Sequence, residues 1–244
     1  MAAERHHRAA LEYWRVNRDA ETGGDRVRDG LNISSRLAFD LAAQGRLAEA
    51  DALLSKGLKE GEALLSSTTL DSSLIHYVAV SHVFRADMIG PRPCNSLNDR
   101  ALAERELRRA TGLYRDLLAR DAKDDTAMEM YAECLIRQAA LSESAPRRES
   151  LGREAMAIIA PRSEQNPDNA DLALSRLRGL SLVASASTLP LYERLAMRFP
   201  ERTDFRLAWI DALLAAGQHD RARGLAADLK RQFPSNADFS CRAE

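Results

Sequence analysis

The sequence contains few of the residues that build β-sheets and tight turns. Aromatic side chains make up only 5% of its 244 residues, and it holds 12 glycines and 8 prolines. Sheets favour aromatic and β-branched side chains, so this composition argues against a sheet protein. Alanine, leucine, arginine and glutamate, which favour helices, predominate instead. We therefore expect an all-α protein.

The chain also lacks an excess of charge of either sign. Its 35 basic and 36 acidic residues leave a net charge of −1. Proteins that bind nucleic acid without regard to base sequence usually carry a basic excess, so we predict no nucleic-acid partner. The run of Arg105, Arg108 and Arg109 is interleaved with acidic residues, which indicates a solvated, salt-bridged helix face.

Cysteine pairs and long apolar runs are missing as well. Cys94, Cys134 and Cys241 are odd in number, lie far apart and form no CxxC pair, as is typical of reduced thiols in the cytosol. No apolar run reaches the length of a membrane-spanning helix, and the first residues lack the apolar core of a signal peptide. We therefore predict a cytoplasmic protein with no membrane partner.

No catalytic or metal-binding motif is recognisable. HExxH is absent, and the segment GPRPCN at 90–95 lacks the glycines and the lysine of a phosphate-binding loop. His6 and His7 are adjacent, so on a helix they point about 100° apart and do not readily share one ion. Cys134 stands among apolar residues, where a core position is favoured over a nucleophile. We therefore predict that the protein is not an enzyme, with no catalytic residue, no cofactor and no metal.

What the chain does contain is a repeat in its last third. Pro167, Pro200 and Pro234 are 33 and 34 residues apart, and each is followed four positions later by aspartate and then an apolar or aromatic residue. This period is that of a two-helix repeat. Proline cannot continue a helix, and aspartate favours the start of the next one.

Pairs of helices follow from this period. The last full repeat has expected helices at 205–216 and 220–232, separated at Gly217, and the repeat before it has a helix at 172–185 and a second one capped by Thr188. Further helices are expected at 3–19, 37–41, 48–58, 74–88, 107–118, 127–141 and 151–159, with loops at 23–24, 89–95 and 144–146. The total is about eleven helices. Tyr13 and Trp14 are expected in the core; the alternative is an exposed terminal patch that would meet a further helix.

Two segments resemble a tetratricopeptide repeat (TPR). In the unit 203–236, the residues that match the family's pattern are Gly217, Asp220, Ala222 and Pro234, with Trp209, Leu213, Ala226 and Leu229 at packing positions. In the unit 31–61, the matching residues are Leu37, Ala38, Leu41, Gly45 and Ala50. Ile210 departs from the pattern, because a small residue is usual at its position, and the earlier unit lacks the final proline.

This resemblance implies a right-handed α-solenoid of stacked antiparallel helix hairpins. We predict a single TPR-like domain over residues 1–244, with looser repeats over 1–165 and regular repeats over 166–236. In this family the inner helices line a concave groove that contacts a protein or peptide partner. The equivalent positions here, which we take as candidate groove residues, include Asn32, Ser35, Phe39, Leu207 and Asp211. They form no basic clamp, so a chaperone-tail ligand is not expected.

The sequence thus predicts a non-catalytic protein-protein interaction scaffold that binds a peptide or a partner domain in its groove. A second interpretation starts from the ends of the chain, because the first helix has no evident preceding partner and Pro234 opens a further repeat. The chain would then be a sensor, regulatory or docking module of a larger bacterial signalling protein, such as a serine/threonine kinase whose helical repeat region it weakly resembles. The sequence indicates neither the identity of the partner nor the oligomeric state.

Overall fold

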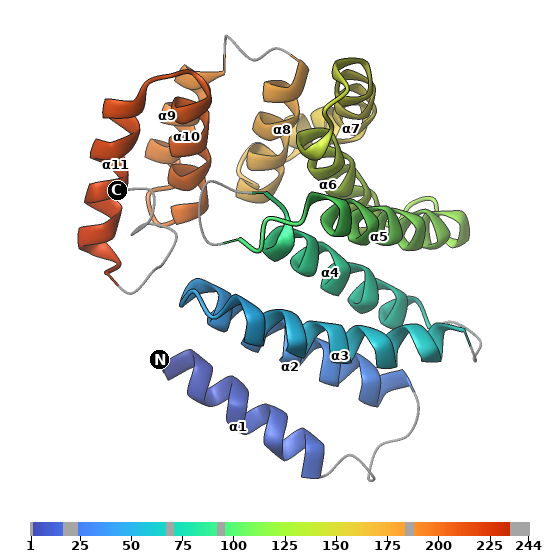
Figure 1. The fold of residues 1–244 in the computed structure, drawn as a ribbon. Helices are drawn as coiled ribbons and strands as arrows, with labels where there is room; N and C mark the ends of the chain where they lie inside the picture. The colour runs from blue at the N-terminus through green and yellow to red at the C-terminus, as the bar shows by residue number, and fades with distance from the viewer. Residues whose placement is uncertain (1, 17–23, 67–70, 92–95, 184–187, 235–244) are drawn as a thin grey trace. The chain divides into compact units, whose positions relative to one another are not determined.

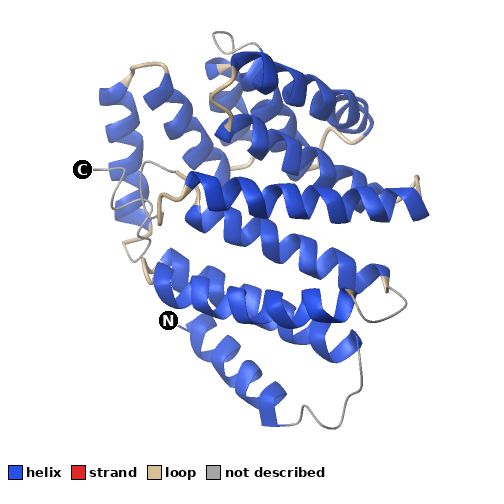
Figure 2. Cartoon of the chain, turned by 45° about the vertical axis from the view of Figure 1, so that its right-hand side comes forward, coloured by secondary structure: helices blue, strands red, loops and turns tan. Residues whose placement is uncertain are grey.

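The computed structural model describes residues 2–16, 24–66, 71–91, 96–183 and 188–234. Within these ranges the chain forms eleven α-helices and no strand (Figure 2). The predictions of an all-α protein and of about eleven helices are therefore confirmed. Cys94, Cys241 and Gly23, which the sequence singled out, lie outside the described residues.

The chain divides into two compact units, unit 1 at Met1–Ala127 and unit 2 at Met128–Glu244, and each is described by itself. The helices, labelled in Figure 1, are α1 (Ala2–Val16), α2 (Gly24–Ala43), α3 (Leu47–Leu65), α4 (Ser72–Ile89), α5 (Arg100–Arg120), α6 (Asp125–Leu141), α7 (Ala145–Gln165), α8 (Ala170–Val183), α9 (Leu189–Arg198), α10 (Thr203–Ala215) and α11 (His219–Gln232). The boundary between the units falls in the first turn of α6. One continuous domain over 1–244 stays a prediction.

Unit 1 consists of two antiparallel helix hairpins and one flanking helix. α2 pairs with α3 and α4 pairs with α5, while α1 packs on α2 (Figure 1). The two hairpins stack because both α2 and α3 also pack against α4. The core where α1, α2, α3 and the end of α4 meet consists of Leu11, Leu37, Ala38, Leu41, Ala50, Leu54 and Met88.

Small residues allow the helices of unit 1 to approach closely. A Cβ atom at Gly61 of α3 would lie 2.7 Å from Val78 Cγ2 of α4 and 3.1 Å from Leu31 Cδ1 of α2. Such distances leave no room for a methyl group unless the neighbours move. The contact of α3 with both α2 and α4 therefore depends on the missing side chain of Gly61.

Unit 2 buries its apolar residues in a series of clusters. One joins α6, α7 and the start of α8 and consists of Ala132, Leu135, Ile136, Ala155, Ile159 and Leu172. A second joins α8, α9 and α10 through Leu174, Ala196 and Phe205, and the Phe205 ring stacks on Phe199 with centroids 5.2 Å apart. A third joins α10 and α11 through Ile210, Leu213, Ala222, Ala226 and Leu229. Cys134 is buried, as predicted.

The same turn closes one hairpin in each unit. Gly45 after α2 and Gly217 after α10 have φ angles of 79° and 72°, a left-handed conformation that favours glycine. In both turns the glycine N–H bonds to the carbonyl three residues back, and the next N–H bonds to the carbonyl five residues back. This is the Schellman arrangement, which satisfies carbonyls at the end of a helix.

Several predicted helix starts differ from those observed: α2 begins at Gly24 rather than 37, and α5 begins at Arg100 rather than 107. α7 begins at Ala145 rather than 151, because the Ser144 side chain accepts a hydrogen bond from the Arg147 N–H and Pro146 fits the first turn. Thr188 stands at the N-cap of α9, but its side chain makes no capping hydrogen bond. Its backbone is helical (φ −92°, ψ −20°) rather than extended, which directs the hydroxyl away from the first helical N–H groups.

The expectation of a core position is wrong for Tyr13. Its side chain is 72% exposed, whereas Trp14 packs against the cluster of unit 1 and donates its indole N–H to the Arg26 carbonyl. Only one face of α1 contacts the rest of unit 1, and residues 13 and 14 are about 100° apart on that helix. Tyr13 therefore faces solvent, whereas its neighbour Trp14 faces the core of unit 1.

Candidate binding groove

A groove of about 370 Å³ opens between α1, α2 and α4 of unit 1. α2 and α4 are the first helices of neighbouring hairpins and pack on each other, while α1 flanks α2. The lining residues are His7 of α1, Asn32, Ser35, Arg36, Phe39 and Asp40 of α2, and Tyr77, Val80 and Phe84 of α4.

Large apolar side chains in this groove remain exposed. Phe39 is 67% and Phe84 is 37% exposed, while Tyr77 and Val80 are half-buried. Residues 77, 80 and 84 follow at spacings of three and four, so they share one face of α4. Full burial of a phenylalanine side chain is worth about 1.5–3 kcal/mol, so a partner that covers both rings gains affinity from them.

The polar side chains of the groove are already oriented by their neighbours. His7 Nδ1 lies 2.6 Å from Asp40 Oδ2, which connects α1 to α2. Arg36 Nε donates to Asn32 Oδ1 at 3.1 Å, one turn earlier on α2. The groove therefore combines two exposed aromatic rings with one guanidinium group and one histidine–carboxylate pair.

Ser35 lies at the base of the groove, where α2 meets α4. It is buried, and its Oγ atom lies 3.0 Å from Ser81 Oγ of α4. Ser81 donates its own hydroxyl proton to the Tyr77 carbonyl at 2.8 Å, so Ser35 must be the donor to Ser81. This hydroxyl connects the two walls of the groove.

On the opposite side of α4, His82 joins this helix to α3 and α5. Its Nδ1 atom lies 2.5 Å from Glu106 Oε2 and its Nε2 atom 2.9 Å from Glu62 Oε1. The ring therefore bridges two carboxyl groups, one at each nitrogen. His82 and Glu106 are both buried.

Two arginines complete this network. Arg85 of α4 bonds to Asp51 of α3 and Glu106 of α5, each at 2.8 Å. Arg109 of α5 bonds to Glu62, and its hydrogen bonds, followed by that of His82, lower the pKa of Glu62 below its ordinary value. The two guanidinium groups and the His82 ring thus lie among the carboxyl groups of Asp51, Glu62 and Glu106. The network fixes the position of α4 behind the groove.

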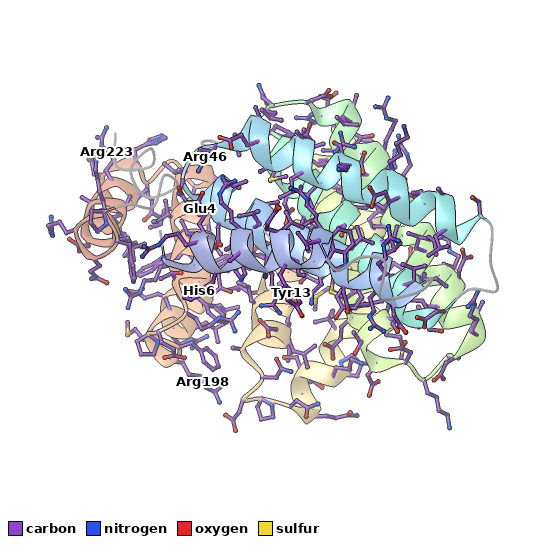
Figure 3. The ribbon with its side chains drawn as sticks, turned by 90° about the horizontal axis from the view of Figure 1, so that it is seen from below. Glu4, His6, Tyr13, Arg46, Arg198 and Arg223 are labelled. Atoms are coloured by element: carbon purple, nitrogen blue, oxygen red, sulfur yellow. The ribbon has the colours of Figure 1, made fainter. Side chains whose placement is uncertain are left out.

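Glu4 anchors the first turn of α1, and His7 lies further along the same helix. Figure 3 shows its side chain beside Arg46, with which it forms a 2.8 Å ion pair. Hydrogen bonds from Arg8, Gln44 and Arg46, of which that from Arg8 contributes most, lower the pKa of Glu4 to about 2. The α1 wall of the groove is therefore held by an ionised carboxylate.

The structure brings together three of the five residues predicted for the groove. Asn32, Ser35 and Phe39 line the groove of unit 1. Leu207 and Asp211 lie one turn apart on α10 of unit 2, where both are half-buried. Leu207 packs against the cluster between α10 and α11.

Sequence reasoning missed six lining residues of the groove. His7, Arg36, Asp40, Tyr77, Val80 and Phe84 were not among the candidates, although the helix at 74–88 was expected. The spacing of Tyr77, Val80 and Phe84 was a usable signal, because it places three large side chains on one face. No comparable signal pointed to the contact between His7 and Asp40, which are 33 residues apart in the sequence.

Two further observations concern other kinds of site. In the part of the chain that the structure describes, no three His, Cys, Asp or Glu residues come together as ligands for a metal ion. None of the described helices is both long and apolar enough to cross a bilayer.

Comparison with known proteins supports the fold. Neither a protein-family model nor a curated protein sequence matches the chain. Among solved structures, a thermophilic TPR protein of Thermus thermophilus is similar, with a TM-score of 0.57 and 19% sequence identity. The match covers 87% of this chain and 96% of that one. The chain thus has the TPR-like, all-α fold of stacked helix hairpins that the resemblance implied.

Proposed function

We propose that this protein is a non-catalytic interaction scaffold that binds a peptide segment of a partner protein in the groove between α1, α2 and α4. The observation that carries the proposal is the exposure of Phe39 and Phe84 within one groove, on two helices that pack on each other. Exposed apolar surface that lines a groove is typical of an interaction site.

The hydrogen bonds of the polar groove residues differ from those of a hydrolytic site. Ser35, His7 and Asp40 all line it, and such residues form hydrolytic triads when the serine bonds to the histidine. Here the hydroxyl of Ser35 is directed to Ser81 instead, and it is buried. This arrangement supports a binding role rather than an enzymatic one.

Selection from a phage-displayed library of random dodecapeptides tests the proposal. The full chain and its Phe39→Ala/Phe84→Ala variant serve as baits, and enriched peptides are then measured by fluorescence polarisation. We expect the double variant to bind at least about tenfold more weakly, equal to about 1.4 kcal/mol, because it lacks both exposed rings.

Met197→Ala is the matched control, because Met197 is also 67% exposed but lies on α9 of unit 2. Its affinity for the selected peptides should equal that of the unchanged protein. Failure to enrich any peptide, or equal binding by the groove variant, would count against the groove as the binding site.

The regulatory alternative and the cytoplasmic location stay predictions. A small ligand or peptide in the same groove would suit a sensor or docking module of a larger signalling protein, such as a bacterial kinase. The groove supports binding in either setting, and the peptide selection applies to both.

A further inference from the structure

Arg36 is the charge in the groove that lacks a counter-ion. It is exposed, and among the residues that the structure describes no carboxylate pairs with it. Several other arginines of unit 1 have such partners: Arg28 pairs with Asp29, Arg46 with Glu49, Arg85 with Asp51 and Arg109 with Glu62. The groove therefore offers a positive group that the chain itself does not neutralise.

The guanidinium group of Arg36 is also oriented in advance. Its Nε atom donates to Asn32 Oδ1 at 3.1 Å, which restricts the side chain and leaves the two terminal nitrogens to a ligand. Paired N–H donors of arginine match the two oxygens of a carboxylate, and a restrained side chain loses less entropy on binding. Asn32 is thus a positioning residue for Arg36.

The negative group of the groove is already occupied. The side chain of Asp40 is only 18% exposed, and its Oδ2 atom lies 2.6 Å from His7 Nδ1. A basic ligand would have to compete with His7, whereas an acidic ligand finds Arg36 available. Charge complementarity therefore favours an acid.

We infer that the occupant is an internal segment of a partner protein in which an acidic side chain stands close to an apolar anchor. Arg36 binds the carboxylate, while Phe39 and Phe84 pack against the anchor. Arg36 and Phe39 are three residues apart on α2, which is about one turn or 5 Å along the axis, so the acid and the anchor lie within about four residues of each other. This inference rests on the proposed function, since it names the partner of the same groove.

The dodecapeptide library tests this inference when each peptide is fused to the phage through its C-terminus, because no free α-carboxylate is then offered. The unchanged protein should enrich peptides with Asp or Glu near Leu, Met or an aromatic residue. Arg36→Glu should lose this preference and enrich Lys or Arg instead, because the sign of the groove charge is reversed. Arg105→Glu is the control, since Arg105 is exposed on α5 and lies outside the groove.

A selected peptide, synthesised with both ends blocked, gives the quantitative test. Arg36→Ala should weaken its binding about tenfold or more, the usual effect of losing hydrogen bonds to a charged group. Asn32→Ala should weaken peptide binding less than Arg36→Ala does. This effect should be limited to peptides that contain an acidic side chain. Raising the salt concentration should weaken binding to the unchanged protein but have little effect on Arg36→Ala.

The outcomes separate this inference from the proposed function. One outcome is that binding requires Phe39 and Phe84, but Arg36→Glu enriches the same peptide sequences as the unchanged protein. The groove is then a binding site, and the inference of an acidic partner is wrong. If no peptide is enriched, both fail. If sedimentation shows a dimer that Phe39→Ala/Phe84→Ala dissociates, a second copy of the chain fills the groove and overturns the inference.

Discussion

The imidazole ring of His82 on α4 connects that helix to α3 and α5. His82 contacts Glu62 of α3 and Glu106 of α5 with its two nitrogens; His82 and Glu106 are buried, and Glu62 is partly exposed. Burial of charges without complete pairing is costly, so each member of such a network depends on the others. His82 therefore helps to hold α4 in position, and the groove lies on the other side of that helix.

His82→Ala should lower the free energy of unfolding by about 1–3 kcal/mol, because it leaves buried Glu106 without one of its hydrogen-bond partners. Urea unfolding followed by circular dichroism measures this change. His6→Ala is the matched control, since His6 is exposed on α1 (Figure 3) and should change stability by less than about 0.5 kcal/mol. Equal stability of the two variants would mean that the network contributes nothing.

Helix packing in unit 1 depends on close approach as much as on apolar burial. α3 touches both α2 and α4 at Gly61, where a methyl group would meet Val78 and Leu31. Glycine is a poor helix former, so its presence in the middle of a helix costs about 1 kcal/mol relative to alanine. The closer contact of three helices offsets that cost.

Gly61→Ala and Gly112→Ala should differ in stability by about 1–3 kcal/mol, with Gly61→Ala the less stable. Both replace a helical glycine, and both gain helix propensity. Only Gly61 is crowded, because a Cβ atom at Gly112 of α5 has no neighbour within 4 Å. Thermal unfolding of the two variants measures the difference, and identical midpoints would show that α3 can shift without loss.

The helices were predictable from sequence because their signals are local. The proline spacing, Gly217 and the apolar periodicity predicted about eleven helices in the observed order, although α2, α5 and α7 begin earlier than expected. The groove was only partly predictable. Asn32 and Phe39 follow from their place on an inner helix, but the importance of Arg36 depends on which carboxylates lie near it in space. The contact of Ser35 with Ser81 likewise joins residues 46 positions apart.

At the scale of the whole molecule, each unit buries apolar clusters of its own. Each core cluster described above draws its members from one unit: the cluster around Leu37 belongs to unit 1, and the clusters around Ile136, Phe205 and Ile210 belong to unit 2. In repeat proteins stability is largely a sum of local terms between neighbouring helices. Damage to one unit is therefore expected to remain local.

Phe205→Ala should reduce hydrogen-exchange protection in α8, α9 and α10, because Phe205 is fully buried and removal of such a ring costs about 3–5 kcal/mol. Protection of α2, α3 and α4 should stay as in the unchanged protein, and so should peptide binding by the groove. Mass spectrometry of the exchanged full chain measures both regions at once. An equal loss in α2–α4 would show that the units unfold together.

The contacts of Glu4 determine the pH range in which the first turn of α1 stays anchored. A carboxyl whose pKa is lowered in the folded state stabilises that state above its ordinary pKa of 4.5, and the contribution is lost only as the pH falls toward about 2. The contacts of Glu4 with Arg8, Gln44 and Arg46 at the first turn of α1 should therefore persist at neutral and at mildly acidic pH. Mild acidity is therefore not expected to break the ionic anchor that Glu4 gives to α1.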